Sequence, residues 1–206
     1  MQLAHTVSAQ VAMDPEPLIF VTSSADKFQE AGLVLPFPLK QVPLELHELQ
    51  SPDLEAVVRN KAEQAWRAVQ APVIVEDTSL RFLAWRQMPG PFIKHFVANL
   101  GLLGMVDSLA PAKDWRAEAI TGVGYADGSG VHYFDGRVMG QIVLPQGKDG
   151  FGWDSIFRPN GSGRTYAEMS REEKAKRSMR TLALRKLAEH LGRPALAGET
   201  AAAPRS

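Results

Sequence analysis

The chain contains no cysteine among its 206 residues. This absence excludes disulfides, thiolate metal sites and cysteine nucleophiles, and it is compatible with a reducing compartment. The 23 basic and 23 acidic residues leave no net charge, which removes the main electrostatic argument for binding nucleic acid or an acidic membrane. No apolar run reaches the roughly 18 residues of a membrane span, and no basic segment followed by an apolar core indicates a secretory signal. We therefore expect a cytoplasmic protein.

What is present is the composition of an ordinary globular protein. Hydrophobic residues make up 45% of the chain and charged residues 22%. The length suffices for one large or two-lobed domain with a proper core. We expect a flexible leader at residues 1–17, a folded domain at 18–192 and a disordered tail rich in Ala, Gly and Pro at 193–206.

The stretch from Pro72 to Phe96 has the densest chemistry. A short, β-branched apolar run indicates a buried strand and leads directly into Glu76, Asp77 and Thr78. Ligands bind at the carboxyl ends of strands in open α/β sheets, and paired carboxylates suit Mg²⁺ that also binds phosphate. A rigid Pro-Gly-Pro turn and Lys94 follow. The order suggests a metal-bound phosphate ester, although a strand with solvated end charges would have the same pattern.

A second phosphate signal follows the apolar strand predicted at 18–21. The segment Thr22–Lys27 consists of small hydroxyl residues and a lysine before a predicted helix. Backbone N–H groups at a helix N-terminus can cradle phosphate, but an ordinary Ser/Thr helix cap would look alike. The glycines of a Walker loop are missing.

A helix is predicted from Ser51, as N-cap, and Pro52, at the first helical position, to about residue 69. Lys61 lies beside its apolar face, so it can reach a crevice or extend into solvent. The loop before this helix carries Glu48.

The middle of the chain predicts a short helix at 100–109 and three strands. Strands at 117–126 and 131–134 flank an Asp-Gly-Ser-Gly hairpin signal, and a third strand covers 137–144. Consecutive strands of this kind suggest an antiparallel part of the sheet or a second lobe.

Two dense patches follow. In Gly150–Asp154, glycines permit close backbone approach to a ligand and two aromatic rings can stack on a base, although a turn with core aromatics fits equally. A capping box at Ser170 predicts a helix to about Leu191. Its Lys174 and Arg180 either belong to a solvated charged face or hold phosphate or base.

Taken in order, the segments TSSADK, VEDTSL, GPFIK, GFGWD and MSREEKAKRSMR resemble the inosine triphosphate pyrophosphatase family, over roughly residues 18–191. The resemblance implies an α/β fold: a mixed sheet with flanking helices, in two lobes around a central nucleotide cleft. It also implies a homodimer. Members of this family use Mg²⁺ to hydrolyse non-standard purine nucleoside triphosphates, such as those of inosine, deoxyinosine and xanthosine, to a nucleoside monophosphate and pyrophosphate.

The resemblance also implies roles for particular residues. Glu48 and Asp77 match metal ligands, and Asp77, with Glu76 beside it, matches the group that accepts a proton from the attacking water. Substrate contacts carry over to Thr22, Ser23, Ser24, Lys27, Lys61, Thr78, Lys94, Phe151, Gly152, Trp153, Asp154, Lys174, Ser178, Met179 and Arg180.

This chain departs from the family pattern in two segments. Ser23 and Ser24 stand where the family has Gly and Asn, and Met179 replaces a histidine that helps to read the base. Methionine cannot donate the hydrogen bond that a 6-keto purine accepts. We therefore predict weaker selectivity for inosine and xanthosine nucleotides, or a preference for another nucleotide.

Two alternatives remain beside this reading. One keeps the chemistry but acts on a pyrimidine or modified nucleotide in a specialised pathway, and the other is a nucleotide-binding protein without catalysis. The presence of Glu48 and Asp77 argues against the second, because a pure binder does not need a metal ligand and a proton acceptor.

Overall fold

The computed structural model describes residues 16–193 and 195–196. The leader expected at 1–17 and the tail expected at 193–206 lie almost entirely outside the described residues, so both stay predictions. At the described end of the tail, the N–H of Leu196 donates to the carbonyl of Val34 over 3.0 Å.

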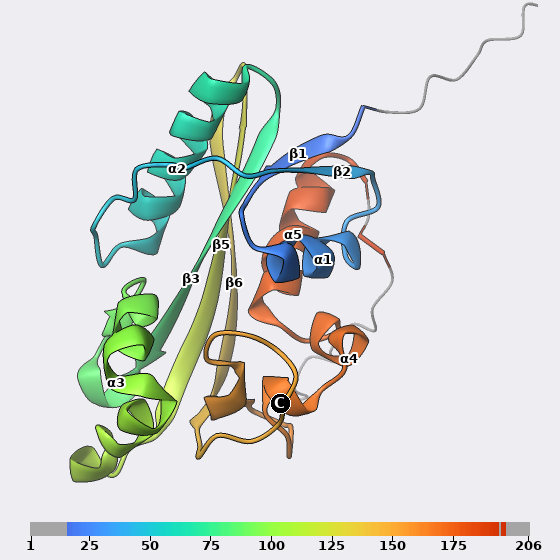
Figure 1. Ribbon diagram of the computed structural model, residues 1–206. Helices are drawn as coiled ribbons and strands as arrows, with labels where there is room; N and C mark the ends of the chain where they lie inside the picture. Colours follow the sequence, from blue (N-terminus) through green and yellow to red (C-terminus); the bar gives the residue numbers. More distant parts are fainter. Residues whose placement is uncertain (1–15, 194, 197–206) are drawn as a thin grey trace, which may run out of the picture.

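A seven-stranded mixed sheet organises the fold (Figure 1). Its order is β2-β1-β3-β5-β6-β7, and β4 pairs with β3. The strands are β1 (Leu18–Val21), β2 (Leu39–Val42), β3 (Val73–Phe82), β4 (Pro89–Gly90), β5 (Arg116–Asp127), β6 (Gly130–Ile142) and β7 (Phe157–Pro159). β1 runs parallel to β2 and β3, and the other pairs are antiparallel. The mixed α/β class expected from the sequence is confirmed.

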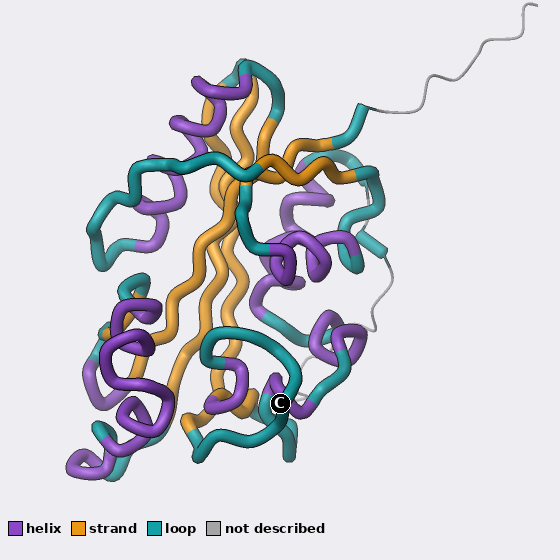
Figure 2. The backbone as a smooth tube through the Cα atoms, viewed as in Figure 1, coloured by secondary structure: helices purple, strands orange, loops and turns teal. Residues whose placement is uncertain are grey.

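Helices flank this sheet on both sides. They are α1 (Ala25–Gly32), α2 (Leu54–Val69), α3 (Ile93–Asp107), α4 (Arg171–Ala175) and α5 (Met179–His190). Short 3-10 turns are η1 (Leu83–Trp85), η2 (Ala110–Ala112), η3 (Asp154–Ile156) and η4 (Tyr166–Glu168). Figures 1 and 2 show α2 beside the upper halves of the long strands, α1 and α5 across the sheet from it, and α3 beside the lower half of β3.

Alternate residues of β3 serve opposite sides of the sheet. Ile74 belongs to the core beneath α1 and α5, whereas Val75 belongs to the core beneath α2. Because successive side chains of a strand point to opposite faces, Glu76 and Thr78 project towards the α1–α5 side and Asp77 towards the α2 side. One strand therefore supplies polar groups to both sides of the sheet.

The core divides the molecule into two lobes. The clusters around Ile74 and Val75 fill the upper lobe, and a third cluster around Leu80, Phe82 and Met105 of α3 fills the lower one. Residues 76–78 of β3 lie between the upper and lower clusters, so the two-lobed arrangement expected from the sequence places them at the junction.

The close approach of α5 to the sheet depends on Gly136. A Cβ at this position of β6 would overlap the carbonyl oxygen of Met179 and crowd the backbone of Ala183. Gly136 therefore lets the first turn of α5 lie directly on the sheet, which fixes the depth at which Met179 and Arg180 enter the molecule.

The prediction of one continuous C-terminal helix is wrong. The helix expected from Ser170 to Leu191 is two helices, because α4 ends at Ala175 and Ser178 begins α5 by accepting a hydrogen bond from the N–H of Thr181 at 3.2 Å. A second capping serine therefore competes successfully with continuation of the first helix. Gly192 follows α5 with φ 68°, as its expected place after the helix requires.

Three other boundaries also differ from expectation. α2 begins at Leu54 with Asp53 as its cap, because the Asp53 carboxylate accepts from the N–H of Glu55 at 3.0 Å. The strands expected at 131–134 and 137–144 are the single strand β6, since Gly136 keeps its place in the ladder opposite Thr121. The helix expected at 100–109 is the later part of α3, which Gly101 interrupts with φ 68°.

Candidate functional site

The middle of β3 has one open edge. β1 pairs with β3 at Val73 and Ile74, and β4 pairs with the same strand at Leu80 and Arg81. Over residues 75–79, no strand of the described chain pairs with β3 on the side away from β5. The sheet therefore leaves a gap where the EDTS segment lies.

Two adjoining cavities, of about 410 and 710 Å³, lie at this gap. Every predicted site residue except Ser178 lines at least one of them. The smaller cavity extends to the segment Phe151–Asp154, and the larger one follows the loop Thr22–Ser24. The structure therefore brings together residues that are distant along the sequence.

Lys61 of α2 joins the two predicted metal ligands. Its Nζ lies 2.6 Å from Oδ2 of Asp77 and 3.1 Å from Oε1 of Glu48. The other carboxylate oxygen of Glu48 accepts from Nζ of Lys94 at the start of α3. The loop before α2, the helix α2 and the strand β3 thus converge on one compact group of charges.

The electrostatics of this group favour the charged forms of Glu48 and Lys61. Burial alone would raise the pKa of Glu48, but hydrogen bonds and charges from Lys94 and Lys61 lower it overall. Burial alone would lower the pKa of Lys61, but the carboxylates of Asp77 and Glu48 raise it. Glu48 and Lys61 therefore lie together as charged groups in the cleft.

The donor set at this point fits a hard divalent cation. Glu48 and Asp77 present carboxylate oxygens that both lie within reach of one point, the Nζ of Lys61. Among the described residues, no group of three or more His, Cys, Asp or Glu side chains is placed to hold a metal ion. Mg²⁺ commonly binds one or two carboxylates and completes its shell with water and substrate phosphate, so two ligands are sufficient for it.

Glu76 lies apart from this group. The sequence placed it beside Asp77, but its carboxylate is on the other side of the sheet, where it accepts from Nε and Nη2 of Arg180 at 2.6 and 2.9 Å. Lys27 of α1 lies 3.3 Å from the same carboxylate. Burial alone would raise the pKa of Glu76, but the charges of Arg180 and Lys27 lower it. The structure therefore shows Glu76 as the partner of two cations, separated from Glu48 and Asp77.

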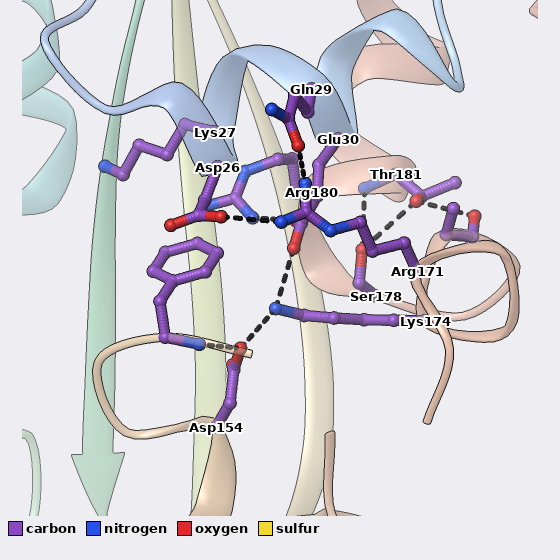
Figure 3. Close-up of polar contacts among 12 residues, drawn as sticks. Asp26, Lys27, Gln29, Glu30, Asp154, Arg171, Lys174, Ser178, Arg180 and Thr181 are labelled. Carbon is purple, nitrogen blue, oxygen red and sulfur yellow. Dashed lines mark hydrogen bonds and ion pairs between the residues drawn. The ribbon is translucent and has the colours of Figure 1, made fainter. Parts of the chain in front are cut away.

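Aromatic and charged groups meet at the far end of the smaller cavity. Nζ of Lys174 lies 4.6 Å from the centre of the Phe151 ring and 2.6 Å from Oδ2 of Asp154 (Figure 3). The same Asp154 oxygen accepts from the N–H of Phe151 at 3.0 Å. Trp153 is buried and packs edge-on against Phe157, with ring centres 5.5 Å apart. Of the two predicted stacking rings, Phe151 thus lies over cations and Trp153 belongs mainly to the core.

Met179 and Ser178 have different places. Met179 is 2% exposed, belongs to the lower core and contributes to the wall of the smaller cavity. Ser178 is buried and serves as the cap of α5, so the structure does not bring its side chain to either cavity.

The loop before α1 is a helix cap that also borders the larger cavity. Oγ of Ser24 accepts from the N–H of Lys27 at 3.3 Å, and Oγ1 of Thr22 accepts from the N–H of Ser24 at 3.1 Å. The cap and the cradle considered from the sequence are therefore compatible, because the loop that caps α1 also borders the cavity.

Sequence reasoning missed Glu30. This residue of α1 is 7% exposed and pairs with both Lys174 and Arg180. Its only sequence signal is the spacing of three positions from Lys27, which places both side chains on one face of the helix. Because a helical glutamate before a loop is ordinarily solvated, the spacing from Lys27 did not indicate a buried residue.

The chain is similar to known proteins over almost the whole of its described length. The model of the Ham1 family matches residues 18–190. An inosine triphosphate pyrophosphatase of Kluyveromyces lactis is 42% identical over 188 residues, which cover 86% of this chain and 97% of that protein. Its counterpart in Saccharomyces cerevisiae is 40% identical over 192 residues, covering 87% and 98%.

Solved structures share the fold. The Ham1 protein of Staphylococcus aureus superposes with a TM-score of 0.75 at 22% identity and covers 86% of this chain and 98% of its own. A nucleoside-triphosphatase, or dITP/XTP pyrophosphatase, of Mycobacterium abscessus gives a TM-score of 0.65 at 24% identity, covering 85% and 98%. No helix within the described residues is long and apolar enough to cross a membrane.

Proposed function

Because the chain belongs to the Ham1 family, we propose that it hydrolyses a nucleoside triphosphate to a nucleoside monophosphate and pyrophosphate. The proposed substrates are the triphosphates of inosine, deoxyinosine and xanthosine. One observation carries the proposal: Glu48, Lys61 and Asp77 meet at the open edge of β3, between the loop Thr22–Ser24 and the cavity lined by Phe151.

The triphosphate would lie along the larger cavity. Lys27, Lys61 and Lys94 all line it, and together they can neutralise much of the phosphate charge. The cap of α1 adds backbone N–H groups at a helix N-terminus, which favour anions. Transfer of a phosphoryl group depends mainly on such positioning and charge neutralisation.

Glu48 and Asp77 would hold the divalent cation, for which Mg²⁺ is proposed. When bound, it supplies charge neutralisation of the phosphate oxygens. Asp77 has a second role as proton acceptor. The oxygen of a water molecule forms a bond to the α-phosphorus, the bond from that phosphorus to the bridging oxygen breaks, and the bridging oxygen leaves with pyrophosphate. The proton of the water passes to Asp77.

The base would occupy the smaller cavity, beside Phe151. Lys174 and Arg180 offer N–H donors there, and donors suit the keto oxygen of a 6-keto purine. Met179 favours a second candidate, in which the same chemistry acts on a modified or pyrimidine nucleotide. Its thioether offers no N–H or O–H donor, so one wall of the cavity does not select for a keto group.

The experiment is a panel of nucleoside triphosphates, with pyrophosphate and orthophosphate measured separately. We expect equal amounts of nucleoside monophosphate and pyrophosphate, with loss of turnover in a chelator and recovery on addition of Mg²⁺. A strong inosine and xanthosine preference would refute the second candidate. Nucleotide binding without any product would instead identify a non-catalytic binder.

The homodimer and the cytoplasmic location stay proposals. The exposed apolar side chains of Leu100 and Leu103 on α3, with exposed fractions of 48% and 59%, support a contact between two copies. Sedimentation of the purified chain at two concentrations tests the first proposal, and localisation of the tagged chain tests the second.

A further inference from the structure

Six buried or partly buried charges form a chain behind the base pocket. It runs from Asp154 to Lys174, then to Glu30, Arg180 and Glu76, and ends at Lys27. The signs alternate along its whole length, so its three carboxylates balance its three cations.

We propose that Glu30 is a positioning residue for nucleoside recognition, acting through Lys174 and Arg180. Its Oε1 lies 2.8 Å from Nζ of Lys174, and its Oε2 accepts from Nη1 of Arg180. Figure 3 shows Glu30 between the two cations, with Asp154 beyond Lys174. The inference rests on the proposed function, since it concerns the base end of the same cleft.

Burial makes Glu30 necessary to both cations. Lys174 and Arg180 are 3% and 1% exposed, and buried charges are tolerated when they are paired. Of the residues that the structure describes, Glu30 alone pairs with both of them. It therefore sets the separation between an ammonium from α4 and a guanidinium from α5.

Both cations keep donors for a ligand. An ammonium has three N–H groups, and Glu30 and Asp154 accept from Lys174. A guanidinium has five, of which Arg180 gives one to Glu30 and two to Glu76. The centre of the Phe151 ring lies 4.6 Å from Lys174 Nζ and 5.4 Å from Arg180 Cζ, so the remaining donors are held beside the proposed stacking ring.

Glu30 lies away from the predicted metal ligands. Glu30 and Arg180 lie on the α1–α5 side, whereas Asp77 pairs with Lys61 on the α2 side. The chain of charges reaches the larger cavity at Glu76 and Lys27, which follow Arg180 along it. A change at Glu30 should therefore weaken binding of the nucleoside and leave the phosphate end in place.

The test is Glu30→Gln, which keeps the shape of the side chain and removes its charge. We expect KM for inosine triphosphate to rise at least about tenfold, as for loss of a buried charged hydrogen bond, with kcat within about threefold of wild type. Inhibition by the two products distinguishes an effect at the nucleoside end of the site from an effect at the phosphate end. Inhibition by inosine monophosphate should weaken about tenfold, whereas inhibition by pyrophosphate should stay unchanged.

Glu63→Gln is the control. It makes the same change of glutamate to glutamine on α2, where Glu63 pairs with Arg67 at the surface and neither residue lines the two cavities. Inhibition of this variant by both products should equal that of wild type.

Two results would overturn the proposal. The first is that inosine monophosphate inhibits Glu30→Gln as strongly as wild type. The second is that inhibition by inosine monophosphate and inhibition by pyrophosphate weaken equally, which indicates a general structural role. If Glu30→Gln does not fold, Glu30→Asp replaces it. This variant keeps the charge but is one methylene too short to reach both cations, and the same two inhibition constants, for inosine monophosphate and for pyrophosphate, are measured. If wild type releases no pyrophosphate, the proposed function fails, and calorimetry of inosine monophosphate binding still decides the role of Glu30.

Discussion

The side chain of Met179 offers a thioether where the smaller cavity meets the lower core. The thioether has no N–H or O–H group, so a nucleobase bound here would gain contact area but no donated hydrogen bond. Neighbouring Lys174 and Arg180 keep their donors but already hold buried carboxylates.

Met179→His should sharpen base selectivity. A histidine N–H can donate to a keto oxygen and is left unpaired by a base without one. We expect the ratio of kcat/KM for inosine over adenosine triphosphate to rise about tenfold. The measurement is pyrophosphate release from both nucleotides. Met179→Leu, which keeps an apolar wall of similar volume, is the control and should leave the ratio unchanged; an unchanged ratio in Met179→His would contradict the assignment.

Residue types indicated most of the site, but not how it is paired. The position of Asp77 after an apolar strand indicated that residue, and the family resemblance added Glu48 and Lys61. From the sequence, Glu76 and Asp77 were expected at the end of a short strand, whereas β3 continues to Phe82, and neighbours within a strand point to opposite faces. Glu30 was missed because its partners come from α4 and α5, more than a hundred residues later along the chain.

At the scale of elements, α5 is held on the sheet by shape and by charge. Gly136 gives the shape, since its missing side chain admits the backbone of Met179. Asp135 of β6 gives the charge, since it lies 3.0 Å from Nζ of Lys186 and 2.7 Å from Nε of Arg137. The position of Arg180 follows from both.

Gly136→Ala should displace α5 and lower stability by about 3 kcal/mol, because the added Cβ meets backbone that cannot rotate away. Nucleoside monophosphate binding should weaken with it, since Arg180 moves. Urea unfolding measures the first effect and calorimetry the second. In Gly128→Ala the new Cβ meets nothing within 4 Å, so this control should stay within about 0.5 kcal/mol of wild type. Equal stability of the two variants would refute the close packing of α5.

Asp135→Asn should lower stability at neutral pH by roughly 0.5 kcal/mol, as for a partly exposed ion pair. Burial alone would raise the pKa of Asp135, but hydrogen bonds from Arg137 and Lys186 lower it from 3.8. Because the folded pKa is the lower one, its contribution is complete above pH 3.8 and is lost as the pH falls through the folded value. Urea unfolding of wild type and variant should therefore differ at pH 7 and converge in acid. A difference that grows in acid would contradict this account.

Element types were predictable because periodicity and caps are local, and the hairpin signal before β6 is of this kind. The residues at which helices and strands begin and end were less predictable. Ser170 and Ser178 are both good caps, and the structure uses both, with α5 packed closely against Gly136.

For the molecule as a whole, the two lobes and the gap in the sheet have a common origin. β3 is longer than its neighbour β1, so it extends beyond the upper core into the lower one and leaves its middle residues unpaired on one edge. The cleft is thus a consequence of strand lengths. Charged side chains reach it from the loop before α2, from β3, from η3 and from all five helices α1 to α5.

The substitution Asp77→Asn tests the central claim most directly, since Asn keeps the shape of the side chain but removes the proton acceptor and a ligand charge. Pyrophosphate release from inosine triphosphate is measured at saturating Mg²⁺, with thermal unfolding as the check on folding. We predict a fall in kcat of at least about a thousandfold with an unchanged melting temperature. A folded Asp77→Asn protein that turns over at the wild-type rate would contradict the account.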